Sequence, residues 1–182
     1  LVSSEGGGIR AAYWTAQVLK TLDERTEGRF GRHVFAFSGV SGGSLGVAGY
    51  VAASLDTRHD GRQAGQQAAQ SAARLDEFLG LDHLAPLVGR LLVTEPWWQL
   101  LPWWWGFPPR DAAFERQFAD DWQAIFQADT LRRPMLEVFA SRADGTMPMV
   151  TLNATHVHSG KRVILSNLQP DPGGADYDAL WN

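Results

Sequence analysis

The stretch Gly39-Val40-Ser41-Gly42-Gly43 stands between an apolar, aromatic run at 34–37 and a run of small and apolar residues at 45–55. The first run is typical of a buried strand, and the second of a helix packed closely against a sheet. A Gly-x-Ser-x-Gly motif between a strand and a helix is typical of a nucleophile elbow, a sharp turn that projects the serine oxygen away from the sheet. Its glycines allow strained backbone and leave room for a substrate. The stretch therefore predicts an α/β fold with Ser41 as a nucleophile.

A second glycine turn, Gly6-Gly7-Gly8, follows a short strand-like segment at 1–3 and precedes an apolar stripe at helical spacing from about Ile9 to Glu24. Backbone N–H groups at such a helix start point outward and suit an anion. A nucleophile beside free amides supplies both parts of acyl transfer, attack on a carbonyl and stabilisation of the oxyanion. We expect Gly6, Gly7, Gly8 and Gly42 to form the oxyanion hole.

The same segment also fits the dinucleotide-binding fingerprint Gly-x-Gly-x-x-Ala through Gly6, Gly8 and Ala11. That fingerprint requires an acidic residue at the end of the next strand, about 20 residues further on. Asp23 and Glu24 stand at that distance, but inside the predicted helix and with no strand before them. Nicotinamide or flavin binding is therefore disfavoured, and we expect no cofactor.

Tryptophans gather in the middle of the chain. From Thr57 to Ala73 the composition is polar, typical of a solvated loop and helix, and the stretch at 75–109 then holds five of the eight tryptophans. Prolines divide this stretch, which predicts an inserted helical cap. Its tryptophans would suit a bilayer interface or an acyl-chain pocket, whereas a buried cap core is the plainer interpretation. Four aromatic residues at helical spacing then predict an amphipathic helix: Phe114, Phe118, Trp122 and Phe126.

Three short strand candidates, 135–140, 149–153 and 162–166, follow this helix. With the earlier units they predict one α/β domain, comprising the glycine loop and elbow at 1–56, a helical insertion at 57–134 and later strands at 135–182.

Two histidines lie in this last third. His156 and His158 alternate on a strand and would face the same side, but no third ligand stands nearby, so we expect no metal site. They also permit a Ser/Asp/His triad with Ser41 and Asp144. The single helix between the glycine loop and Ser41 argues against that triad, because the α/β-hydrolase order places more elements there.

Composition narrows the choice of partners. The net charge of −4 offers no basic surface for nucleic acid, and the absence of cysteine excludes disulfides and thiolate metal sites.

No apolar run reaches the roughly 20 residues that cross a bilayer, and no signal peptide is visible. The sequence opens on Leu1 and stops at Asn182 without a closing element, so we expect a partial domain from a cytoplasmic or membrane-associated protein.

Two motifs in this order resemble the patatin-like phospholipase family and its relative, the catalytic domain of cytosolic phospholipase A2. They are Glu5-Gly-Gly-Gly-Ile-Arg10-Ala and Gly39-Val-Ser41-Gly-Gly-Ser44, and Asn153-Ala-Thr155 is similar to a late strand of bacterial members. The resemblance implies a three-layer α/β/α fold and a serine lipid acyl hydrolase with a Ser/Asp dyad. It further implies that Arg10 meets the substrate phosphate, that phospholipids or acylglycerols are the substrates, and that the protein contacts membranes peripherally.

The base of that dyad is not visible in the sequence. The family uses the Asp of an Asp-Gly-Gly or Asp-Gly-Ala motif, and neither Asp60-Gly61-Arg nor Asp144-Gly145-Thr fits. Glu5 and Ala11 also depart from the usual patatin residues, which leaves the subfamily open. We expect the catalytic Asp beyond Asn182 and expect this segment alone to be inactive. A lipid-binding module of the same fold without catalysis is the alternative.

Overall fold

The computed structural model describes residues 1–57, 64–81, 110–140 and 148–168. It confirms the α/β class. The elements in chain order are β1 (Val2–Ser4), α1 (Gly8–Arg25), α2 (Phe30–His33), β2 (Ala36–Val40), α3 (Gly42–Thr57), α4 (Ala64–Gly80), α7 (Arg110–Phe126), the 3-10 helix η3 (Thr130–Arg132), α8 (Met135–Ala140), β3 (Met149–Thr155) and β4 (Arg162–Ser166).

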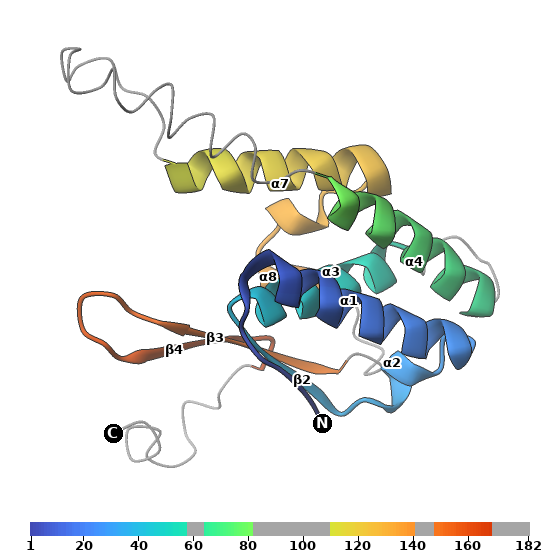
Figure 1. Cartoon of the computed structure of the whole chain (residues 1–182), viewed down its shortest axis with the longest axis horizontal. Coiled ribbons are helices and arrows are strands. Elements are labelled where there is room, and N and C mark those ends of the chain that lie inside the picture. Colours follow the sequence, from blue (N-terminus) through green and yellow to red (C-terminus); the bar gives the residue numbers. More distant parts are fainter. Residues whose placement is uncertain (58–63, 82–109, 141–147, 169–182) are drawn as a thin grey trace.

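The four strands form one mixed sheet in the order β1-β2-β3-β4 (Figure 1). β1, β2 and β3 are parallel, and β4 returns antiparallel to β3. The unit β1-α1-α2-β2 is a crossover connection, as parallel neighbours require. The carboxyl ends of the three parallel strands therefore meet at one edge of the sheet, where open α/β sheets bind their ligands.

The two faces of the sheet differ in polarity. Phe37 and Val150 are paired in register and fully buried against residues of α1 and α3. The alternate positions form a row of hydroxyl side chains across all four strands: Ser3, Ser38, Thr151 and Ser166. In the described part of the chain, α1, α3, α4 and α7 lie on the side of Phe37 (Figure 1). The apolar core therefore lies between this face and the helices.

Helices α1 and α3 touch backbone to backbone. A Cβ atom at Gly46 would lie 2.5 Å from the carbonyl oxygen of Ala12 and 2.7 Å from Cβ of Thr15. One turn earlier, a Cβ atom at Gly42 would lie 1.9 Å from the oxygen of Gly8. The two helices therefore run in the same direction from neighbouring strand ends, and only glycine fits where they meet.

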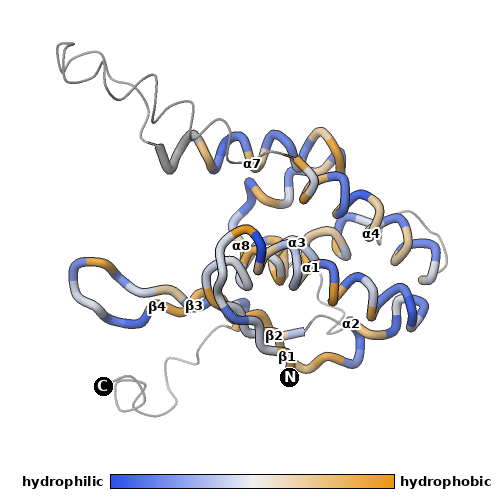
Figure 2. The backbone as a smooth tube through the Cα atoms, viewed as in Figure 1, coloured by the Kyte–Doolittle hydropathy of each residue, from blue (hydrophilic) through white to orange (hydrophobic). Residues whose placement is uncertain are grey.

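Aromatic residues attach the outer helices to this core. Trp122 of α7 is fully buried, stacks on Phe126 with ring centroids 4.0 Å apart, and meets Phe78 of α4 edge to face at 5.0 Å. Its indole N–H donates to Asp56 of α3 at 2.9 Å. This confirms the predicted amphipathic helix. Figure 2 shows hydrophilic and hydrophobic positions alternating along α1 and α4, as expected for helices with one buried face.

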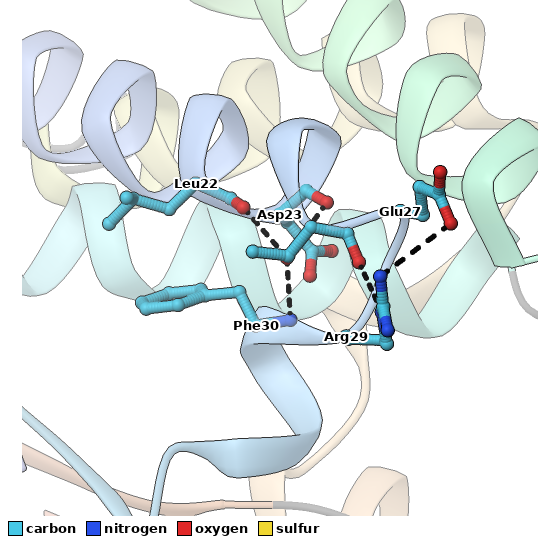
Figure 3. A network of polar contacts seen from close by, with 6 residues as sticks. Leu22, Asp23, Glu27, Arg29 and Phe30 are labelled. Carbon is cyan, nitrogen blue, oxygen red and sulfur yellow. Dashed lines mark hydrogen bonds and ion pairs between the residues drawn. The ribbon is translucent and has the colours of Figure 1, made fainter.

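A polar network closes the connection from α1 to α2 (Figure 3). The hydroxyl of Thr26 donates to the carbonyl of Leu22 at 2.8 Å and accepts the N–H of Phe30, also at 2.8 Å. The carboxylate of Asp23 accepts the N–H of Gly31 at 3.1 Å. These bonds satisfy the end of α1 and direct the chain into β2.

One predicted strand is wrong. Residues 135–140 form the helix α8, with the carbonyl of Pro134 accepting the N–H groups of Glu137 and Val138 at 3.0 and 3.2 Å. A six-residue apolar run does not distinguish strand from helix, and a preceding proline favours a helix start. The strand predicted at 34–37 is present but runs from Ala36 to Val40.

Two sequence predictions fall largely outside the described residues. The tryptophan-rich stretch has only its first seven residues, 75–81, in the described part, and all of these except Leu81 belong to α4. The turn with Asp144 is likewise outside it. In the described ranges, no helix combines the length and the hydropathy that a bilayer-spanning segment requires.

Candidate active site

Ser41 occupies a strained turn between β2 and α3. Its φ angle is +53°, in the left-handed region that non-glycine residues rarely adopt. Its carbonyl accepts the N–H groups of Ser44 at 3.0 Å and Leu45 at 3.3 Å, so α3 begins directly behind it. The side chain is exposed. A strained, exposed serine between a parallel strand and a helix has the geometry of a nucleophile elbow.

The glycines around Ser41 are required by close backbone contacts. A Cβ atom at Gly39 would lie 2.6 Å from Cα of Ser44, and one at Gly43 would lie 2.6 Å from the carbonyl oxygen of Glu5. Neither position has space for a side chain. The motif glycines are therefore explained by the tightness of the turn and by its contact with the chain leaving β1.

The glycine loop lies against the elbow, as the sequence predicts. A Cβ atom at Gly6 would lie 3.2 Å from Cβ of Ser41 and 3.9 Å from its Oγ. Gly8, with a φ angle of +63°, contacts Gly42 through its carbonyl group. The first residues of both helices have no intrahelical acceptor for their N–H groups. The positive ends of α1 and α3 thus converge beside the Ser41 hydroxyl.

Arg10 is the basic residue of the first motif. It lies on the first turn of α1 with an exposed side chain. It is absent from the described residues that line the cleft next to Ser41.

That cleft, of about 810 Å³, is open to solvent and is bounded by the elbow and by the β3–β4 hairpin. Its described lining is Val40, Ser41, Asn153, Ala154, Thr155, Gly160 and Arg162. Neither Asn153 nor Arg162 belongs to the site predicted from the sequence. Asn153 lies there because the end of a strand parallel to β2 must lie at the same sheet edge, and no local pattern in the sequence specifies that pairing.

Asn153 binds the strand that carries the nucleophile. Its Nδ2 donates to Oγ of Ser38 and to the carbonyl oxygen of Gly39, both at 3.1 Å. The Cα atoms of Asn153 and Val40 are paired in the parallel ladder. The half-buried amide therefore bonds two consecutive residues near the end of β2, and Val40 alone separates them from Ser41.

No acid or histidine is among the described residues that line the cleft. His156 and His158 are exposed in the hairpin turn, with ring centroids 5.8 Å apart, and Nδ1 of His156 lies 2.8 Å from Oγ of Ser159. The part of the chain that the structure describes contains no cluster of acidic, histidine or cysteine ligands able to hold a metal. The described lining of the cleft therefore offers no general base for Ser41.

No protein-family model, curated protein or solved structure matches this chain. The function of this protein is therefore inferred from the geometry around Ser41.

Proposed function

We propose that this protein is a serine lipid acyl hydrolase of the patatin-like type, with Ser41 as its nucleophile. The observation that carries the proposal is the positive φ angle of Ser41 at a strand-to-helix turn against which Gly6 packs. Maintaining a strained serine requires support from the surrounding structure, and such strain gathers at functional sites. The adjacent helix N-termini supply N–H donors where an acyl-transfer oxyanion develops.

In this mechanism, Oγ of Ser41 attacks the ester carbonyl carbon while a base takes its proton. The carbonyl oxygen becomes an oxyanion, which the N–H groups of Gly42 and the glycine loop 6–8 stabilise. The tetrahedral intermediate collapses, the C–O bond to the alcohol breaks, and the alcohol departs with a proton. Water then attacks the acyl-enzyme and releases the fatty acid, which restores the serine.

The base in this proposal is an aspartate that forms a Ser/Asp dyad. It lies outside the described residues, and the resemblance to patatin-like enzymes favours a position following Asn182. Asp144, which a triad with His156 or His158 would use, is also outside the described residues. Neither histidine is among the described residues that line the cleft, so the dyad is favoured over the triad.

The finer architecture belongs to the same proposal. We propose a three-layer α/β/α sheet with a tryptophan-rich cap inserted between α4 and α7. Parallel strands joined by crossovers are usually covered on both faces, and α1, α3 and α4 supply one of the two layers.

Phospholipids or acylglycerols are the proposed substrates. Apolar side chains are exposed on the elements that carry the site, including Val40 and Leu45 beside Ser41 and Ile9, Tyr13 and Trp14 on the first turns of α1. Trp14 is 72% exposed, and tryptophan and tyrosine suit a membrane–water interface. Together with the cations Arg10 and Arg162, these residues favour peripheral contact of a cytoplasmic or membrane-associated protein with a lipid surface.

A fluorophosphonate probe tests the proposal, because it reacts covalently with activated serines. The test uses residues 1–182 and a version extended past Asn182. We expect labelling in the extended version, loss of labelling in Ser41→Ala, and retention in the control Ser44→Ala, which removes a hydroxyl three residues away. Labelling that survives Ser41→Ala would contradict the proposal.

A lipid-binding module without catalysis is the second candidate, because no acid is present in the described lining of the cleft. It predicts vesicle binding that persists in Ser41→Ala and no ester hydrolysis by the extended version. The hydrolase predicts turnover that depends on Ser41.

A further inference from the structure

We infer that Asn153 is a positioning residue that holds the Ser41 turn in its strained conformation. As a statement about catalysis, this inference depends on the proposed function. As a statement about the turn, it depends only on the contacts of Asn153 with β2.

The direction of the two hydrogen bonds is fixed by chemistry. The carbonyl oxygen of Gly39 can only accept, so the atom facing it must be the amide nitrogen of Asn153, at 3.1 Å. The same nitrogen lies 3.1 Å from Oγ of Ser38, which can accept its second hydrogen. Both N–H groups of one amide are therefore directed at consecutive residues of β2. A side chain without two donors on one atom does not reproduce this arrangement.

The bonded residues, Ser38 and Gly39, stand just upstream of the strained one, with only Val40 between Gly39 and Ser41. Other contacts already enclose the turn, because Gly39 packs on Ser44 and Gly42 packs on Gly8. These packing contacts prevent the turn from becoming tighter, but they do not prevent it from opening. Among the side chains that the structure describes, Asn153 alone donates hydrogen bonds to the last three residues of β2. It therefore opposes relaxation of the φ angle of Ser41, which a strained position needs in order to persist.

A second asparagine provides a matched comparison at the opposite end of β3. Oδ1 of Asn167 accepts the N–H of Val150 at 2.8 Å, and its Nδ2 donates to the carbonyl of Pro148 at 3.3 Å. Both asparagines thus connect a side-chain amide to a carbonyl near β3, and both are half-buried. Only Asn153 contacts the strand end that leads to Ser41. Replacing each by aspartate separates a local effect on the turn from general weakening of the sheet.

The experiment measures hydrogen exchange of the backbone at 36–45 and the rate of fluorophosphonate labelling in the extended version. The variants are Asn153→Ala, Asn153→Asp and Asn167→Asp. At pH 8 we expect the backbone amides at 36–45 to exchange at least about fivefold faster in both Asn153 variants than in the unmodified protein. We also expect both variants to react with the probe at least about tenfold more slowly. The loss should appear in the maximal labelling rate and not in the probe concentration that gives half of that rate. Asn167→Asp should change neither quantity.

Acidic pH distinguishes positioning from packing. Protonation turns the carboxyl of Asn153→Asp into a donor that can again bond the carbonyl of Gly39. Arg162 is the charged group among the described residues lining this cleft, and it favours the ionised form. We therefore compare the labelling rates of Asn153→Asp and Asn153→Ala at each pH. Both variants keep the same catalytic base, so its titration changes both rates equally and cancels in their ratio. The ratio of their labelling rates should rise as the pH falls from 8 to 5.

Unchanged exchange at 36–45 in both Asn153 variants would overturn the inference, as would a labelling ratio that stays flat with pH. Faster exchange in a protein whose Ser41 takes no probe would support the role of Asn153 in the turn and contradict the proposed hydrolase.

Discussion

Gly6 and Ser41 face each other so closely that a methyl group on Gly6 would lie 3.2 Å from Cβ of Ser41 and 3.9 Å from its Oγ. The two motifs, separated by more than thirty residues in sequence, therefore share one surface. In the proposed mechanism, this contact brings the backbone N–H groups of the loop near the position that an ester oxygen would occupy after attack. The proposed oxyanion hole depends on this contact.

Gly6→Ala should reduce reactivity while leaving the protein folded. The added methyl must displace Ser41 or the loop by a few tenths of an ångström, which misaligns donor and nucleophile. We expect labelling by a fluorophosphonate to slow by about tenfold or more, since loss of an oxyanion donor costs roughly 100-fold. Gly80→Ala, at the end of α4 with open space around it, is the control. Equal labelling rates in the two variants would contradict the proposed oxyanion loop.

The strain at Ser41 predicts a difference in stability between two inactive variants. Glycine adopts a φ angle of +53° freely, whereas alanine retains the strain. Ser41→Gly should therefore exceed Ser41→Ala in free energy of unfolding by about 1 kcal/mol, measured by chemical denaturation. At Ser44, inside α3, the order should reverse, with the alanine variant more stable by about 1 kcal/mol. A Ser41→Ala variant at least as stable as Ser41→Gly would mean that Ser41 is not strained.

Much of the site could be predicted from the sequence because glycine turns are local features. Gly6, Gly8, Gly42 and Ser41 come together because each turn ends a strand, and the strands are parallel neighbours. Asn153 could not be assigned in this way. Its role depends on the register between β2 and β3, which are separated by more than a hundred residues and whose pairing no local pattern specifies.

Helix α8 illustrates a different limit. The residues at 135–140 are apolar enough for either a strand or a helix, and in the helix that forms Val138 is buried. The choice depends on Pro134 and on packing against the core. The sequence also predicted only in part which residues of α1 are buried, because Tyr13 and Leu22 belong to its apolar stripe but are exposed. An apolar stripe predicts a helix more securely than it predicts which side of that helix is covered.

Two glycines of α3 should respond oppositely to alanine. At Gly49 the added methyl would lie 3.5 Å from Cδ1 of Leu75, an ordinary contact, so helix propensity should raise the free energy of unfolding by about 0.5–1 kcal/mol. At Gly46 it would lie 2.5 Å from the carbonyl oxygen of Ala12, which forces α1 and α3 apart. We expect a loss of about 1–3 kcal/mol there. A stabilising Gly46→Ala would show that the two helices do not touch through their backbones.

Arg162 should contribute more than Arg10 to recognition of an anionic head group. It lines the same cleft as Ser41 and pairs in register with Thr155, whereas Arg10 is absent from the described lining. β4 lies two strands from β2, about 10 Å away. An extended arginine side chain reaches across part of that distance, so the gap left between its guanidinium group and Ser41 is about the size of a phospholipid head group. The cation would therefore meet the phosphate while the ester reaches Ser41.

Steady-state hydrolysis by the extended version tests this assignment. For an anionic phospholipid, Arg162→Ala should raise KM by about tenfold, which corresponds to about 1.4 kcal/mol of binding free energy. For a neutral acylglycerol, KM should change by less than about twofold, because no phosphate is present. Lys161→Ala removes the neighbouring exposed cation outside the cleft lining and should leave both values unchanged. If Arg10→Ala instead produces the selective increase in KM, the phosphate lies over α1, and the cleft beside β4 holds another part of the substrate.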